Sequence, residues 1–190
     1  MNRANTFLKI TSTLIISICL TIYGAAAHAA INVAVNCTIN GNDVVGESSV
    51  ISMDREGSVE VYGLGTSVHT PLDPATGIAL GGTQFMPVRI LKRVDSSTIP
   101  FIDALVHTKP IDCTLRFFDV AITEAEILLY TVTISNGYVV SVSQHLPDRE
   151  DEELGNISNM REVIGISYQN ITWSYDNGGT SHSAGTLQQN

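Results

Sequence analysis

Residues 161–175 read REVIGISYQNITWSY, a run rich in β-branched and aromatic residues that contains no proline. Apolar residues recur at alternate positions through much of it, and this period of two is typical of a strand with one buried face. We therefore expect a long strand from Arg161 to Tyr175, near the end of a mainly β domain.

The preceding chain continues this pattern in shorter segments. Alternation predicts further strands at 31–39, 58–64, 84–94, 111–120, 126–134 and 138–144. Between the last two lies Ser135-Asn136-Gly137, and Asn-Gly flanked by apolar alternation is a strong hairpin signal. One helix is expected, with Thr98 as its cap and its end before Lys109-Pro110. The sum predicts a mainly antiparallel β-barrel or β-sandwich with one flanking α-helix.

Residues 66–82 interrupt the strands with a segment rich in Gly, Pro and Thr. A loop of this length in a compact domain is usually a functional or contact element, although it can also be merely solvated. We take it as the candidate contact loop. Its candidate contact residues are Val68, His69, Pro71, Asp73, Pro74, Gly81 and Gly82.

Residues 1–29 have the organisation of a secretory signal peptide. Arg3 and Lys9 precede an apolar core at 10–23, which is followed by Ala25-Ala26-Ala27-His28-Ala29. This arrangement predicts cleavage before Ala30. A retained membrane anchor is the alternative, but a core of about 14 residues is short for a membrane span, which needs roughly 20.

Cleavage would leave a domain at 30–176 and a Gly/Ser/Thr/Gln-rich segment at 177–190, which we expect to be a flexible tail. The expected location is secreted or periplasmic.

Cleavage also removes Cys19, so that Cys37 and Cys113 remain. An oxidising compartment would let them pair. Sequence alone does not place their Cα atoms within bridging distance, and two buried free thiols fit the apolar contexts equally well.

The charge balance limits the possible partners. The chain has 190 residues with 10 Lys+Arg against 19 Asp+Glu, a formal net charge of −9. Without Arg3 and Lys9 the balance is 8 against 19, or −11. Nucleic acid and anionic membranes both require a Lys/Arg surface, so neither is expected as a partner.

The sequence contains no recognisable catalytic or metal-binding motif. The histidines of the mature chain have no ligand spacing between them, and neither a Gly-x-Ser-x-Gly elbow nor a phosphate-binding loop occurs; these histidines are His69, His107, His145 and His182. We therefore expect no enzyme activity, no cofactor and no metal. A binding or assembly role is favoured.

Several stretches, taken in order, resemble one family. They are Gly46-Glu47-Ser48, VHTPLDP at 68–74, FMPVRI at 85–90 leading through Asp95-Ser96-Ser97 into the helix, YVVSVS at 138–143 with HLP at 145–147, and EVIGISYQNITWSY at 162–175. The set resembles the haemolysin-coregulated protein (Hcp), the tube subunit of bacterial type VI secretion systems. The likeness covers nearly all of residues 31–180.

This resemblance implies a small β-barrel with a flanking helix, of which six copies close into a ring. Such rings stack into a tube that carries effectors, and its partners are sheath, spike and effector proteins. Ring contacts of this kind are heterologous, and the acidic chain needs basic residues such as Arg89, Lys92 and Arg93 to meet acids across subunits.

Two features depart from the family pattern. Pro100 lies one residue later than the usual helix-start proline, and tube subunits are expected to assemble in the cytoplasm without a cleaved leader. The chain is then a specialised exported relative, or its leader comes from an unused upstream start codon. The alternatives are an exported fimbrial-type β-sandwich subunit and, last, a periplasmic effector hydrolase.

Overall fold

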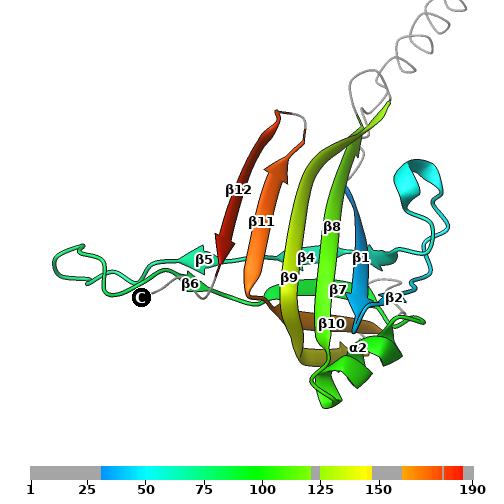
Figure 1. Cartoon of the computed structure of the whole chain (residues 1–190), viewed down its shortest axis with the longest axis horizontal. Helices are drawn as coiled ribbons and strands as arrows, with labels where there is room; N and C mark the ends of the chain where they lie inside the picture. The colour runs from blue at the N-terminus through cyan, green and yellow to red at the C-terminus, as the bar shows by residue number, and fades with distance from the viewer. Residues whose placement is uncertain (1–30, 121–124, 147–159, 177, 186–190) are drawn as a thin grey trace, which may run out of the picture. The chain divides into compact units, whose positions relative to one another are not determined.

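The computed structural model describes residues 31–120, 125–146, 160–176 and 178–185 (Figure 1). The predicted leader at 1–29 and the acidic run Glu150–Glu153 lie outside these residues. The elements are, in chain order, β1 (Asn32–Ile39), β2 (Asn42–Val44), the 3-10 turn η1 (Ser52–Asp54), β3 (Val59–Val61), β4 (Gly63–Gly65), β5 (Val68–His69), β6 (Gln84–Phe85), β7 (Val88–Arg93), α2 (Thr98–Val106), β8 (Pro110–Val120), β9 (Glu126–His145), β10 (Arg161–Ser167), β11 (Asn170–Tyr175) and β12 (Thr180–Gly185). The described residues are therefore mainly β with one flanking helix, as the sequence predicts.

The strands form two layers that share β9. In the first layer β1, β8, the first half of β9, β11 and β12 run side by side, and β2 and β3 pair with the other side of β1. In the second layer the other half of β9 pairs with β10, followed by β7 and β4. Figure 1 shows β4, β7 and β10 crossing the long strands of the first layer. The path of paired strands runs from β2 to β4 without closing, so the described residues form a sandwich-like fold rather than a closed barrel.

The strand β9 is continuous where the sequence predicts a hairpin, and that prediction is wrong. Asn136 has a φ of 52°, and the register with β8 shifts nearby, between Ile111 and Cys113. A Cβ on Gly137 would lie 2.4 Å from the Ser167 carbonyl oxygen, so only glycine fits there. The Asn-Gly pair therefore provides a β-bulge, at which β9 passes from the first layer into the second.

The predicted long strand at 161–175 is two consecutive strands along the same partner. Arg161 lies opposite His145 at one end of this ladder, and Tyr175 lies opposite Tyr130 at the other. The break between β10 and β11 falls opposite the bulge of β9. The two strands therefore bend together, and this shared bend joins the layers.

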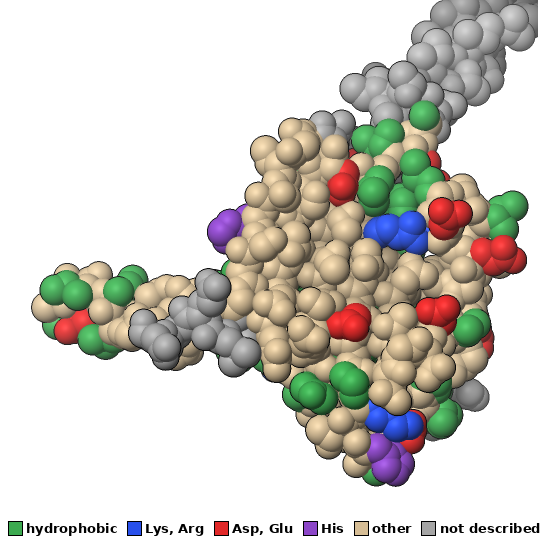
Figure 2. All heavy atoms as spheres, viewed as in Figure 1, with side chains coloured by type: hydrophobic (Ala, Val, Ile, Leu, Met, Phe, Trp, Pro, Cys, Tyr) green, Lys and Arg blue, Asp and Glu red, His purple; other side chains and the backbone are tan. Residues whose placement is uncertain are grey.

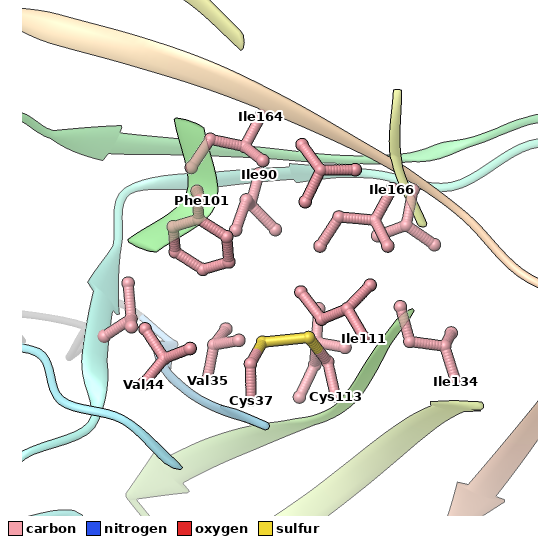
Figure 3. Close-up of a cluster of buried hydrophobic side chains, with 14 of the residues drawn as sticks. Val35, Cys37, Val44, Ile90, Phe101, Ile111, Cys113, Ile134, Ile164 and Ile166 are labelled. Atoms are coloured by element: carbon pink, nitrogen blue, oxygen red, sulfur yellow. A yellow bond between two sulfur atoms is a disulfide. The ribbon is translucent and has the colours of Figure 1, made fainter. Parts of the chain in front are cut away.

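The core fills the space between the layers, and Figure 3 shows the side chains of both layers converging there. Alternation along each strand directs one set of side chains inward. The first layer contributes Val35, Cys37, Ile39, Ile111, Cys113, Leu115, Val132, Ile134 and Ile171, and the second contributes Val88, Ile90, Val139, Ile164 and Ile166. From α2, Phe101 and Ala104 are fully buried against them.

Three local predictions require correction. The cap position of α2 is Ser97 and makes no side-chain cap hydrogen bond, whereas Thr98 begins the helix and its side chain is buried. The predicted strand at 58–64 is divided at Tyr62 into β3 and β4. Residues 180–185 of the predicted tail form β12, which pairs with β11 along its length.

Candidate functional site: a projecting arm

The predicted contact loop is a two-stranded arm that extends away from both layers (Figure 1). At its base β5 pairs with β6, and the Met86 N–H donates to the Ser67 carbonyl at 3.0 Å. Further out, Leu72 and Ala79 form an isolated β-bridge. We call residues 66–86 the arm.

The arm exposes apolar side chains. Leu72 is 59% exposed, Ile78 is 66% exposed and Leu80 is 55% exposed. Figure 2 shows hydrophobic side chains gathered toward the end of the arm, with an acidic side chain among them. An isolated two-stranded ribbon is at best marginally stable in water, and clustered exposed apolar groups mark interaction sites. The arm is therefore suited to burial against another surface.

The first candidate contact residues form the base of the arm. Val68 and His69 make up β5, and both are exposed. Pro71 is half-buried, and its carbonyl accepts a hydrogen bond from the Leu80 N–H at 2.8 Å. The backbones of these residues pair within the arm, and most of their side chains remain accessible.

The remaining candidate residues form the turns. The Asp73 carboxylate accepts a hydrogen bond from the Ala75 N–H at 2.8 Å. That bond and one from the Thr76 side chain hold the pKa of Asp73 below its ordinary value of 3.8. Pro74 and Gly82 are exposed, and Gly81 has a φ of 86°, which favours glycine. These residues belong to one continuous segment, and the sequence gives no sign that its two halves pair.

Cys37 and Cys113 lie directly opposite one another on β1 and β8. They form a disulfide between residues 76 positions apart, and both are buried in the core (Figure 3). Directly opposed residues of an antiparallel pair are close enough for such a bond. The register of two distant strands therefore decides a pairing that the sequence leaves open.

A buried ionic cluster, which the sequence analysis missed, joins the second layer to α2. Lys92 and Glu162 are fully buried neighbours on β7 and β10, and their side chains pair at 2.7 Å. Lys92 also pairs with Asp95 at 2.7 Å. The Thr98 hydroxyl donates to Glu162 at 2.7 Å, and the Gln144 amide donates to the other carboxylate oxygen of Glu162 at 3.0 Å.

This cluster corrects the expectation that Lys92 meets acids across subunits, because its charge is satisfied within the chain. The alternation along each strand could have revealed the cluster. On β7, Lys92 follows Val88 and Ile90 at alternate positions that point inward. On β10, Glu162 shares its inward face with Ile164 and Ile166. Buried charges persist where they are paired and hydrogen-bonded, so the cluster has a structural role.

The described residues contain no group of three or more His, Cys, Asp or Glu side chains that could hold a metal ion. No helix among them is long and apolar enough to cross a membrane. Exposed apolar side chains such as those of the arm are a common mark of an interaction site.

Comparison with known proteins identifies the class. A family model described as "Type VI secretion system effector, Hcp" matches residues 37–175. The "Major exported protein" of Pseudomonas aeruginosa is 24% identical over 141 residues, covering 72% of this chain and 81% of the relative. The chain belongs to the Hcp family of type VI secretion proteins.

Solved structures agree in fold. A mutant Hcp1 protein from E. coli EAEC 042 matches with a TM-score of 0.70 at 26% identity, covering 82% of this chain and 99% of that one. The secreted protein Hcp3 from Pseudomonas aeruginosa matches with a TM-score of 0.64 at 18% identity, with coverages of 82% and 98%. The resemblance seen in the sequence is thereby confirmed.

Proposed function

We propose that this chain is a non-enzymatic tube subunit that closes into rings of six copies, which stack into a hollow tube. The observation that carries this proposal is the exposed apolar arm on an Hcp fold. A hairpin with so little cover gains stability when it is buried against a second copy. Cyclic assembly provides such burial, because each copy offers one surface and receives another.

The partners follow from the same role. In a type VI system the tube lies inside a contracting sheath, ends at a spike and carries effector proteins. We therefore infer sheath, spike and effector partners for this chain. No nucleic acid is expected, because the net charge of −9 repels phosphate.

We also propose that the chain is exported through its leader and folds outside the cytoplasm. The leader-like composition of 1–29 supports this route. The buried Cys37–Cys113 disulfide supports it independently, because such bonds form and persist in oxidising compartments. The mature protein would then begin at Ala30 and assemble in the periplasm or beyond it.

The native mass of the protein purified from its own host tests the assembly. We expect mass photometry at neutral pH to show six copies per particle, and electron microscopy at high concentration to show stacked rings. A particle that stays monomeric at high concentration would contradict the proposal.

Mass spectrometry of the N-terminal peptide tests the export route. We expect the first residue to be Ala30 and the two cysteines to resist alkylation until the protein is reduced. An intact Met1 with both thiols free would overturn the route while leaving the assembly proposal untouched.

A further inference from the structure

A row of basic side chains crosses the outer face of the second layer. Arg93 on β7 lies directly opposite Arg161 on β10, which in turn lies opposite His145 on β9. All three sit at outward positions, because their neighbours Lys92 and Glu162 point inward. Neighbouring strands are about 4.8 Å apart, so the row brings two guanidinium groups and an imidazole together. Arg89, which is also exposed, lies on the same outward face of β7 as Arg93.

This row is unbalanced within the described part of the chain. The ion pairs there join Arg55 to Glu126, Lys92 to Asp95 and Glu162, and Asp103 to Lys109 and His107. None of them involves the arginines of the row or Arg89. Like charges placed directly opposite on neighbouring strands are destabilising. The arginines therefore give this face of the described residues a positive charge, which suits an anionic partner.

The same face has the other properties of a contact surface. The Arg93 guanidinium lies 4.9 Å from the centre of the Tyr62 ring, which holds it in place. Next to the row lie the half-buried side chains Leu91 and Val163. Arginine and tyrosine around an apolar centre are typical of protein interfaces.

An acidic hollow lies on the opposite side of the sandwich. It has a volume of about 560 Å³ and is bounded by the outer face of the first layer and the segment around Gly57. Asp43, Glu56 and Asp112 line it, and no Lys or Arg does. All three acids are exposed. Because the layers face each other across the core, their outer faces point in opposite directions.

We propose that the basic row of one copy docks into the acidic hollow of the next copy. The inference rests on the proposed self-assembly and names the two surfaces that meet. The contact is heterologous, and contacts of this kind close into rings when the rotation between successive copies permits it and otherwise continue as open filaments. Opposite potentials steer the two copies together and fix their orientation. Docking also separates the clustered arginines from one another by placing carboxylates between them.

A charge-swap experiment tests the proposal. Variant A carries Arg93→Glu and Arg161→Glu, and variant B carries Asp43→Arg and Glu56→Arg. We expect each variant alone to need at least a tenfold higher protein concentration than the wild type to form six-copy particles. Mixed in equal amounts, A and B should recover six-copy particles, because a ring of alternating copies restores every contact. Dissociation of wild-type rings should increase with salt concentration, since exposed charges are screened.

Two comparisons keep the result interpretable. Thr180→Glu/Ser181→Glu makes the charge change of one substitution in variant A, but at exposed residues of β12 that belong to neither surface, and we expect it to assemble like the wild type. Thermal unfolding of variant A should match the wild type; a large loss of stability would mean that the row serves the folded monomer, which overturns the inference.

The remaining outcomes also separate the two proposals. If the wild type forms rings and variant A assembles equally well, the docking surfaces are wrong while the tube function stands. If A and B are both impaired and their mixture does not recover, the row and the hollow do not meet. A wild type that never assembles removes the tube function itself.

Discussion

The sandwich core and the arm of this protein are stabilised in opposite ways. In the core, apolar side chains from both layers surround the Cys37–Cys113 disulfide, and the Lys92–Glu162 pair is fully buried. In the arm, the strands pair with each other at the base and near Leu72, Tyr168 donates to the Met86 carbonyl, and Leu72, Ile78 and Leu80 face solvent. The core is covered within one chain, whereas these three side chains of the arm are not.

This difference assigns separate tasks to the two regions. Substitutions in the core should change the free energy of unfolding, and substitutions in the arm should change association. Variants of each region test that division.

Replacing Lys92 should be the most damaging single change in the core. Lys92→Met leaves the Glu162 carboxylate fully buried without its cation, so we expect a loss on the order of 5 kcal/mol in the free energy of unfolding. Urea unfolding, monitored by circular dichroism, measures this loss. The double variant Lys92→Met/Glu162→Gln should recover more than half of the loss. Lys109→Met, which breaks an exposed pair, should cost less than about 1 kcal/mol. Equal costs for the two lysines would contradict the assignment.

Removing the disulfide should have the next largest effect. The double variant Cys37→Ala/Cys113→Ala frees a loop of 76 residues in the unfolded chain, and loop-closure entropy predicts a loss of about 4 kcal/mol. Unfolding of the wild type with and without reductant gives an independent estimate. Reductant should leave the stability of the double variant unchanged. A wild type whose unfolding midpoint ignores reductant would show that the bond contributes nothing.

Polar substitutions in the arm should leave stability unchanged but weaken association. In the triple variant Leu72→Ser/Ile78→Ser/Leu80→Ser, the free energy of unfolding should stay within about 0.5 kcal/mol of the wild type, because all three side chains are exposed. Six-copy particles should require at least tenfold more protein in mass photometry. Val106→Ser is a control on the equally exposed face of α2. Unaltered association of the triple variant would mean that the arm has no partner.

The smallest effect concerns the turn of the arm. The hydrogen bonds to Asp73 lower the pKa of its carboxyl group, so its contribution is present above pH 3.8 and is lost as the pH falls through the lowered value. Carbon-detected NMR should therefore place its titration midpoint below 3.8. Asp73→Asn should remove this titration without changing assembly at neutral pH. A midpoint at or above 3.8 would show that the turn does not form in solution.

Much of the fold could be predicted because each strand carries its own alternation. The period of two identifies β1 and β8 closely, and helical spacing identifies α2. The wrong predictions occur where one local sequence pattern is compatible with two different structures. Asn136-Gly137 permits a turn or a bulge, and only the strands that cross at Gly137 select the bulge.

The candidate site divides in the same way. Composition alone marks residues 66–82 as unusual and marks the chain as acidic. It does not show that Arg93 and Arg161 share a row, because these residues are distant in sequence and meet through strand register. The buried state of Lys92 was missed for the same reason, since its partner Glu162 lies on another strand.

The sequence by itself therefore determined the strand-rich class, the family resemblance, the leader-like start and the segment that becomes the arm, because each depends on neighbouring residues. Only the tertiary structure decided the bulge in β9, the disulfide, the ionic cluster and the two charged faces. Each of these depends on the register and layering of strands far apart in the chain. Register is a property of the packed core as a whole, in which a slip of one residue would turn every inward side chain outward.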